Sequence, residues 1–295
     1  MTAPRVVVVG DIVTDVVVST PGPVAVGSDT AARIVVGDGG AGGNVAAWLR
    51  AVDVGVGLVV RVGDDPAGRD AVGRLADAGV LMAAATDPQT PTGTVVALLD
   101  AGGQRTMLTD RGANRRLAAA DLPAAWFRSG AHLHLSGYVL FDAPGRAAGL
   151  QALRLASAAG MTISVDPASW APLRWWGAAR FLTATAGASL TLPNADEARV
   201  LTGVGDAADA AARLARHHGS AVVTCGADGA VWSDGGATVH GRAAHATVTD
   251  TTGAGDAFTA GYLAATLGGA GPAEALERAA HLAARAVGGR GARPA

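Results

Sequence analysis

The 295-residue sequence contains no lysine, so arginine supplies all 23 of its Lys and Arg side chains. Two kinds of nucleotide site are thereby excluded. A Walker A loop places a lysine beside the β- and γ-phosphates, and enzymes of the protein-kinase type need a lysine on a strand. If this chain binds phosphate groups, it must use backbone amides, arginine or a metal ion.

Cysteine and excess charge are scarce as well. The single cysteine, Cys225, excludes an internal disulfide and fits a reducing compartment. The formal net charge of −2 offers no basic patch for nucleic acid and no cationic surface for a membrane. The apolar run at Val6–Val9 ends at Gly10 and is too short for a signal peptide or a membrane span. We therefore expect a cytoplasmic enzyme that binds neither nucleic acid nor membrane.

Runs of β-branched residues alternate with alanine-rich helical runs over most of the chain. This alternation predicts an α/β fold with a doubly wound, mostly parallel sheet, in a single domain spanning residues 1–295. Two segments, at about 13–36 and 90–109, are β-prone without a helix and predict a second, small β-sheet. The main strands are expected at Val6–Val9, Gly57–Val62, His132–Leu135, Thr162–Val165, Leu190–Leu192 and Ala221–Thr224, and the helices at Asn44–Ala51, Ala67–Ala78, Pro144–Ala159, Ala195–Leu201 and Ala207–His217.

The most informative motif reads DTTGAGDAF and occupies residues 250–258. A β-prone run at His245–Thr249 precedes it, and a helical run at Ala257–Leu267 follows it. Small residues at the start of a helix leave backbone N–H groups free, and the helix dipole adds partial positive charge there. Asp256 lies in that first turn, where we expect its carboxylate to be ionised. The motif predicts a base beside an anion site.

A second glycine-rich motif, GDGGAGGN at residues 37–44, follows an expected strand and opens a helix. It contains the G-x-G-x-x-G fingerprint of dinucleotide-binding folds, with Asp64 in the place of the ribose-binding acid. The same residues also read as Gly-Gly-x-x-x-Asn, from Gly39 to Asn44. Adjacent glycines let a polyol approach the backbone, and the Asn44 amide offers both a donor and an acceptor to hydroxyl groups. Asn44 could equally be a helix N-cap.

Together the two motifs resemble the terminal signatures of the ribokinase-like (PfkB-type) family of sugar and nucleoside kinases. The resemblance implies that Asp256 deprotonates the acceptor hydroxyl. It also implies that the amides of Gly253, Ala254 and Gly255 form the anion hole for the transferring phosphate. The two helix-free segments would then be a lid that closes over the sugar and supplies the contact of a homodimer.

Shorter elements between the signatures resemble the same family. Asp15, five residues after Gly10, corresponds to its acidic sugar contact. A carboxylate can accept hydrogen bonds from two sugar hydroxyls at once, which suits a polyol. The resemblance therefore implies a sugar site formed by Asp15, Gly39, Gly40 and Asn44.

The nucleotide side of the site is implied by two further elements. The segment from Asn194 to Glu197 resembles the family element that organises the waters around Mg²⁺ and the ATP phosphates, so Glu197 would contact the metal through water. By spacing alone the same two residues form a capping box, with Asn194 as the N-cap. The loop containing Thr224, Gly226 and Gly229 resembles the adenine-nucleotide loop.

Three other positions bear on ions and specificity. Asp250 and Thr252 match positions that help to hold K⁺ in some members, so the resemblance suggests a monovalent-cation site without requiring it. Val13 stands where ribokinases carry an asparagine, so ribose is not singled out as the substrate. We expect Arg111, which follows the second lid segment, to lie on the surface.

The sequence therefore predicts an ATP- and Mg²⁺-dependent kinase that phosphorylates a hydroxymethyl group of a small sugar. A nucleoside kinase of the same fold, of the adenosine or pseudouridine type, is the first alternative. A non-catalytic sugar sensor and an NAD-linked oxidoreductase are the others. The sequence does not identify the sugar.

Overall fold

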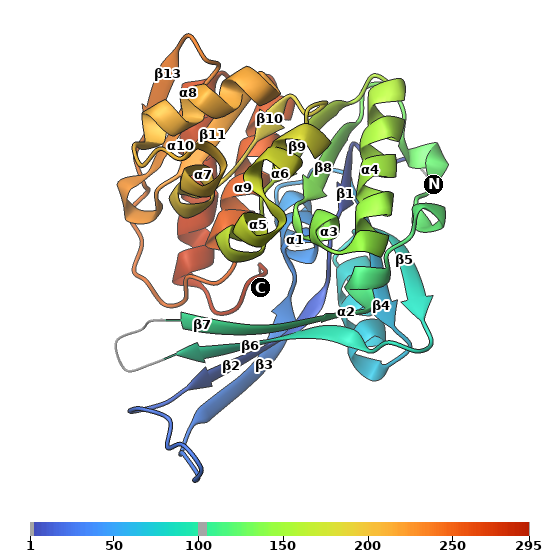
Figure 1. The fold of residues 1–295 in the computed structure, drawn as a ribbon, viewed down its shortest axis with the longest axis vertical. Coiled ribbons are helices and arrows are strands. Elements are labelled where there is room, and N and C mark those ends of the chain that lie inside the picture. Colours follow the sequence, from blue (N-terminus) through green and yellow to red (C-terminus); the bar gives the residue numbers. More distant parts are fainter. Residues whose placement is uncertain (1–2, 100–104, 295) are drawn as a thin grey trace.

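The computed structural model describes residues 3–99 and 105–294, so residues 100–104 of the segment predicted at 90–109 lie outside the described part. The chain forms two sheets of different kinds, and the helices pack around the larger one (Figure 1). No helix within the described ranges combines the length and the apolar character that a membrane span needs.

The larger sheet has nine strands, and all of its neighbouring strands from β11 to β5 run parallel. Its interior strand β1 consists of four consecutive valines with no exposed surface, as expected of a strand covered by helices on both faces. These findings confirm the predicted α/β fold. The strand order is β13 (Thr238–Gly241), β12 (Ala230–Ser233), β11 (Ser220–Thr224), β10 (Leu190–Thr191), β9 (Thr162–Asp166), β8 (His132–Ser136), β1 (Val6–Val9), β4 (Val56–Gly63) and β5 (Leu81–Asp87).

Side chains of β1 alternate between two hydrophobic clusters. Val6 and Val8 pack with apolar residues of helices α1, α9 and α10, whereas Val7 and Val9 pack with those of α4, α6 and α8. The helices are α1 (Ala41–Ala51), α2 (Pro66–Asp77), α3 (Tyr138–Phe141), α4 (Ala143–Ala158), α5 (Trp170–Trp176), α6 (Ala178–Ala184), α7 (Ala195–Thr202), α8 (Ala207–His218), α9 (Ala254–Leu267) and α10 (Pro272–Gly288), with 3₁₀ turns η1 (Ala113–Arg116), η2 (Ala119–Asp121), η3 (Ala124–Trp126) and η4 (Gly226–Asp228).

The smaller sheet projects from one end of this body as a lid (Figure 1). It contains four strands in the order β3 (Arg33–Gly39), β2 (Val13–Ser19), β6 (Thr92–Leu99) and β7 (Arg105–Gly112). The inner strands β2 and β6 pair in parallel, and the outer pairs are antiparallel. The predicted small sheet is thus confirmed, and β3 leads from it directly into α1.

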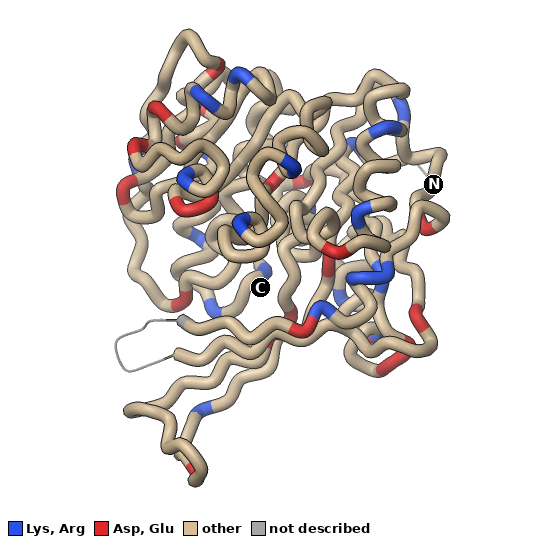
Figure 2. The backbone as a smooth tube through the Cα atoms, in the orientation of Figure 1, with Lys and Arg blue, Asp and Glu red and all other residues tan. Residues whose placement is uncertain are grey.

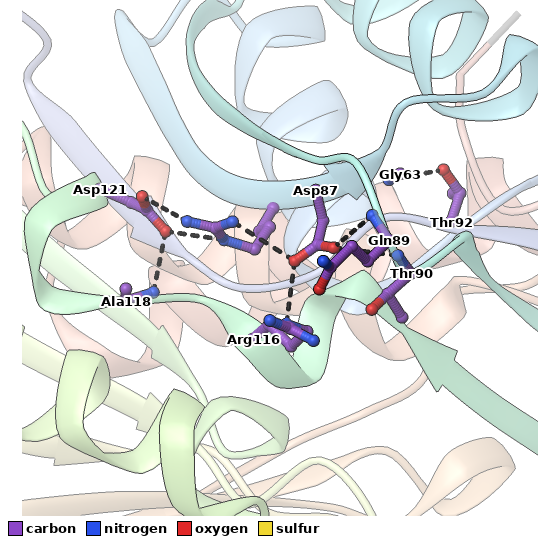
Figure 3. Close-up of polar contacts among 9 residues, drawn as sticks. Gly63, Asp87, Gln89, Thr90, Thr92, Arg116, Ala118 and Asp121 are labelled. Carbon is purple, nitrogen blue, oxygen red and sulfur yellow. Dashed lines mark hydrogen bonds and ion pairs between the residues drawn. The ribbon is translucent and has the colours of Figure 1, made fainter.

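A network of ion pairs and hydrogen bonds holds the root of the lid, where β5 turns into β6 (Figure 3). Asp87 ends β5 and is only 2% exposed. Its carboxylate accepts hydrogen bonds from the amides of Gln89 (3.0 Å) and Thr90 (2.9 Å) and pairs with Arg116 at 3.0 Å. Arg61, from β4, lies 3.5 Å from the same carboxylate. The chain therefore enters β6 from an anchored turn.

One predicted β segment is wrong. Residues 245–249 form no strand and are largely exposed on the way from β13 to α9. β-branched residues favour strands only where they can pack on a pleated, half-buried surface, and this segment has no place in either sheet.

Candidate active site

The polar residues of interest gather at the carboxyl ends of the parallel strands. Asp11 follows β1, Asp166 ends β9, Asn194 follows β10 and Thr224 ends β11. The chain runs from β1 towards β4 and β5 and then returns to β8 on the other side of β1, so the strand order reverses there. Open α/β sheets bind ligands at this kind of switch point.

The start of helix α9 faces this edge. Gly253 is its N-cap, in a left-handed conformation with φ of 75°, and the helix begins at Ala254. The first main-chain bond inside the helix runs from Ala257 N to Gly253 O at 2.9 Å, so the amides of Gly255 and Asp256 come before it. A Cβ atom added to Gly255 would meet no described atom within 4 Å. The helix thus presents amides beside open space.

The two glycine-rich motifs meet through one hydrogen bond. Asn44 Nδ2 donates to Asp256 Oδ2 at 2.8 Å, although 212 positions separate the residues in sequence. Helix α1 begins at Ala41 with Gly40 as its N-cap, so Asn44 lies inside the helix. The alternative that Asn44 is a helix N-cap is therefore wrong, and its amide is committed to the site.

Burial raises the pKa of Asp256 to about 8. The negative charges of Asp166, Asp11 and Asp15 act in the same direction, whereas the hydrogen bond from Asn44 lowers the pKa. The expectation of a readily ionised carboxylate is therefore wrong, because burial among other acids outweighs the favourable helix start. A pKa near neutrality suits a group that must accept and then release a proton.

The residues predicted to hold the sugar lie close together. Asp15, on β2, packs its carboxylate so closely on Gly39 that a Cβ atom at Gly39 would overlap it. Gly40 has φ of 95°, and a Cβ atom there would lie 2.6 Å from the carbonyl oxygen of Asp11. Together with Asn44, these residues form one polar wall beside Asp256.

On the nucleotide side, Asn194 and Glu197 form the capping box that their spacing allowed. Glu197 Oε2 accepts from Asn194 N at 2.9 Å, and Oε1 accepts from Asn194 Nδ2 at 2.7 Å. Glu197 is 3% exposed, and burial, reinforced by the charge of Asp166, raises its pKa. Asn194 also bridges to Thr224 on the adjoining strand. The two predicted nucleotide elements are therefore neighbours.

The loop after β11 is a tight turn. Gly229 has φ of 92°, and a Cβ atom there would overlap the carbonyl oxygen of Gly241. Cys225 N donates to Gly229 O at 2.8 Å, which closes the turn around η4. Gly226 is exposed at the start of this turn, beside Thr224. The loop thus offers Thr224 and Gly226 to a ligand, while Gly229 shapes it.

The predicted cation positions contact each other. Asp250 Oδ1 accepts from Thr252 N at 2.9 Å and from Thr252 Oγ1 at 2.6 Å, while Asp250 Oδ2 accepts from Gly291 N at 3.1 Å. This arrangement ties the motif to the C-terminal segment. A monovalent cation at Asp250 and Thr252 stays a prediction.

Among residues 3–99 and 105–294, no group of three or more His, Cys, Asp or Glu side chains is arranged to enclose a metal ion. Mg²⁺ does not need such a cage, because it keeps several waters and is usually held by one or two carboxylates and the substrate phosphates. Asp166 and Glu197 fit that role. Burial raises the pKa of both, the charge of Asp11 adds to the shift of Asp166, and the charge of Asp166 adds to that of Glu197. A divalent cation would relieve this repulsion between carboxylates.

Sequence reasoning missed three residues. Asp11 and Asp166 could have been found, because each stands at the carboxyl end of a predicted strand. Arg293 carried no comparable signal. It lies two residues before Ala295, yet its Nε donates to Asn44 Oδ1 at 3.2 Å and its Nη2 to Gly39 O at 2.9 Å.

Two other expectations need correction. Arg111 is mostly buried, with its side chain 13% exposed, pairs with Asp142 at 2.9 Å and lies over the ring of Tyr138. The dinucleotide fingerprint is a coincidence of sequence, because the strand before it is lid strand β3 and not a strand of the parallel sheet. Asp64, its supposed ribose ligand, pairs with Arg69 on the surface at 2.8 Å.

A parallel α/β sheet with a β lid, and an aspartate at an amide-rich helix start in contact with the helix that leads out of lid strand β3, define an enzyme of the small-molecule kinase class. The pfkB family of carbohydrate kinases matches residues 3–295. The chain belongs to this family.

Two relatives of known function are similar to this chain over most of its length. A fructokinase from Klebsiella pneumoniae is 34% identical over 246 residues, covering 80% of this chain and 79% of the relative. An ATP-dependent ribose-1-phosphate kinase from Halopiger xanaduensis is 32% identical over 264 residues, covering 87% and 82%.

Two solved structures share the fold over nearly the whole chain. The fructokinase of Vibrio cholerae O395, with fructose, ADP and calcium ion bound, has a TM-score of 0.83 at 26% identity and covers 98% of this chain and 94% of its own. The aminoimidazole riboside kinase of Salmonella enterica, with aminoimidazole riboside and an ATP analogue, has a TM-score of 0.80 at 27% identity and covers 97% and 94%.

Proposed function

We propose that this carbohydrate kinase transfers the γ-phosphoryl group of ATP to a hydroxymethyl group of a small sugar of the fructose type. The observation that carries the proposal is the 2.8 Å hydrogen bond from Asn44 to Asp256 at the start of α9. This bond joins the carboxyl group that we assign as the proton acceptor to a residue that we assign to the polyol, beside the amides at the start of α9. The fructokinase relatives support a hexose as the acceptor.

In the proposed mechanism, Asn44 holds Asp256 through Oδ2, and we assign Oδ1 as the oxygen that takes the proton from the sugar hydroxyl. The resulting alkoxide attacks the γ-phosphorus of ATP, and ADP leaves. The amides of Gly253, Ala254 and Gly255 donate to the γ-phosphoryl oxygens as negative charge moves across them. Asp15 and Gly39 orient the sugar so that the attacking oxygen lies in line.

The nucleotide is assigned to the neighbouring strand ends. Thr224 and Gly226 would contact its ribose and phosphates, with the turn shaped by Gly229. Asp166 and Glu197, the latter held by Asn194, would carry Mg²⁺ through water. When bound, Mg²⁺ neutralises part of the phosphate charge. Lid closure excludes water, which would otherwise compete as the acceptor.

A homodimer through the lid completes the proposal. Val36, Val16, Val96 and Leu108 lie directly opposite one another across the four strands, on the face away from Asp15. Val36 is 65% exposed and Leu108 56% exposed. Charged residues are sparse along the lid strands (Figure 2). A second copy of the chain would cover this apolar face and its open edges.

The test is an assay of ADP release coupled to a panel of acceptors: fructose, ribose, ribose 1-phosphate, a keto-deoxy sugar acid, adenosine and aminoimidazole riboside. We expect the highest kcat/KM with a free sugar. A nucleoside as the best acceptor would select the nucleoside-kinase alternative instead. The Asp256→Asn variant should lose about 10²-fold or more in kcat, as expected for removal of a general base. Unchanged turnover in that variant at saturating sugar would overturn the mechanism.

A further inference from the structure

The C-terminal segment passes between the two glycine-rich motifs. Ala292 is 2% exposed, and its carbonyl oxygen accepts a hydrogen bond from Trp48 Nε1, on α1, at 2.9 Å. One residue earlier, Gly291 N donates to Asp250 Oδ2 at 3.1 Å. One residue later, the side chain of Arg293 reaches Asn44 and Gly39. This segment therefore touches both motifs.

Glycines in both motifs leave room for this segment. A Cβ atom added to Gly43 would lie 2.6 Å from Arg293 Nη2. A Cβ atom at Gly253 would overlap the main chain of Ala292. A side chain at Gly253 would therefore force the C-terminal backbone to move, and one at Gly43 would displace the end of the Arg293 side chain.

The hydrogen bonds of Arg293 determine how the Asn44 amide is oriented. A guanidinium group donates hydrogen bonds and accepts none, so Arg293 Nε can bond only to the oxygen of the amide. The nitrogen, Nδ2, is then turned towards Asp256. Without Arg293, the amide could rotate and accept a hydrogen bond from the protonated carboxyl group, which would end the donation to Asp256 and favour its protonated form.

The guanidinium group is itself held on its other side. Arg293 Nη1 lies 3.3 Å from Asp38 Oδ2 on lid strand β3. Arg74, on α2, forms a bidentate pair with the same Asp38 carboxylate, at 2.6 and 2.7 Å. The Arg293 side chain is only 11% exposed. A planar group with partners on three sides has little freedom, which is the property that a positioning residue needs.

We propose that Arg293 is a positioning residue for phosphoryl transfer, which acts by fixing the Asn44 amide so that Asn44 Nδ2 holds the Asp256 carboxylate. The inference rests on the proposed role of Asp256 as the general base. It assigns to the C-terminal segment a part in catalysis, in addition to its packing against Trp48. Arg293 itself needs no contact with the sugar or the nucleotide.

The experiment compares Arg293→Gln and Arg293→Lys with Arg290→Gln, an exposed arginine of the same segment that serves as the matched control. For each variant, kcat, the KM values for fructose and ATP, and the melting temperature are measured. We expect Arg293→Gln to lower kcat by about 10- to 100-fold, the scale of a misplaced catalytic group. The KM for ATP should change little, and Arg293→Lys, which keeps the charge, should recover part of the rate. Arg290→Gln should match the parent.

A double-mutant cycle separates positioning from packing. In the Asn44→Ala background, Arg293→Gln should lower kcat by less than about twofold, because the amide that it orients is gone. An Arg293→Gln effect of the same size with and without Asn44 would overturn the proposal. So would a lowered melting temperature with unchanged kcat, which a purely structural residue would give. If Arg293→Gln does not fold, the same cycle with Arg293→Lys decides.

Failure of this inference can be told from failure of the mechanism. If Asp256→Asn is active, the assignment of Asp256 as the general base is wrong, whatever the effect of Arg293 substitutions. If Asp256→Asn is inactive but the effects of the Arg293 and Asn44 substitutions are additive, the assignment of Asp256 as the general base stands. Only the positioning role of Arg293 is then refuted.

Discussion

Two opposing influences act on the carboxyl group of Asp256, the residue that we assign as the general base. Burial raises its pKa to about 8, and the hydrogen bond from Asn44 pulls the pKa down and fixes one oxygen. A carboxylate with a raised pKa is a stronger base towards a hydroxyl group than one with the ordinary pKa near 4. The residue therefore depends on its buried, acidic surroundings as much as on its place at the start of α9.

The pH dependence of the reaction follows from this raised pKa. Asp256 must be deprotonated to act as the base, so kcat/KM for ATP, which reports the free enzyme, should fall as the pH drops below about 8. The fall approaches tenfold per pH unit. The measurement is a pH–rate profile of the parent and of Asp256→Asn. The decline in kcat/KM below about pH 8 should be missing from the variant. A decline in the parent that is centred near pH 4 would contradict the prediction.

At the scale of elements, the start of α9 combines a structural glycine and a functional one. Gly253 has φ of 75° and packs against Ala292, so Gly253→Ala should lower the melting temperature, with a backbone cost of about 1–2 kcal/mol before any overlap is counted. Gly255 lies in helical conformation beside open space. Gly255→Ala should therefore keep or raise the melting temperature, since alanine is favoured over glycine in a helix by about 1 kcal/mol.

Comparing Gly253→Ala with Gly255→Ala should separate effects on stability from effects on activity. The methyl group of Gly255→Ala enters the open space that we assign to the γ-phosphoryl group, so kcat should fall by about tenfold, the lower end of the loss seen on perturbing an anion hole. Thermal unfolding and steady-state kinetics on both variants test this. A fully active Gly255→Ala variant would place the phosphoryl group elsewhere.

The root of the lid gives a second prediction for an element. Asp87 accepts two main-chain hydrogen bonds and pairs with Arg116 and Arg61. An asparagine there would leave Arg116 without its charge partner and Arg61 with Asp121 alone. Asp87→Asn should therefore lower the melting temperature by several degrees and raise the KM for fructose more than that for ATP. The control is Asp64→Asn, which removes an exposed pair with Arg69 that contributes little. Equal melting temperatures would contradict the prediction.

Strands and helices were predictable because hydrophobic period and glycine placement are local properties. The valines of β1 and the helix after residue 253 could be identified from their neighbours alone. That Asn44 and Asp256 belong to one site was implied only by the family resemblance. Arg293 could not be predicted, because its partners are more than 240 positions away and arginine is usually exposed. The raised pKa of Asp256 likewise depends on burial, which is created only when α1, α9 and the lid root meet.

At the scale of the whole molecule, the lid sheet has two unlike faces. Strand alternation puts Asp15 and Val95 on one face, and Ile34, Val36 and Leu108 on the other. We assign the first face to the sugar. The second is apolar and exposed, and extended sheet edges of this kind pair readily with another chain. An isolated lid would therefore be costly in water, and a dimer would keep it extended over the site.

The dimer gives the last prediction. The chain of 29.0 kDa should sediment at twice its mass at micromolar concentration, and Ile34→Asp, which puts a charge on the edge strand β3 of the outer face, should sediment as a monomer. Val248→Asp is the matched control, because Val248 is similarly exposed but lies outside the lid. The monomer should also show a higher KM for fructose with little change in the KM for ATP, because the lid contacts only the sugar. A parent that sediments as a monomer would mean that the outer face remains in water, and the lid would then have to be held over the sugar by its root at Asp87 alone.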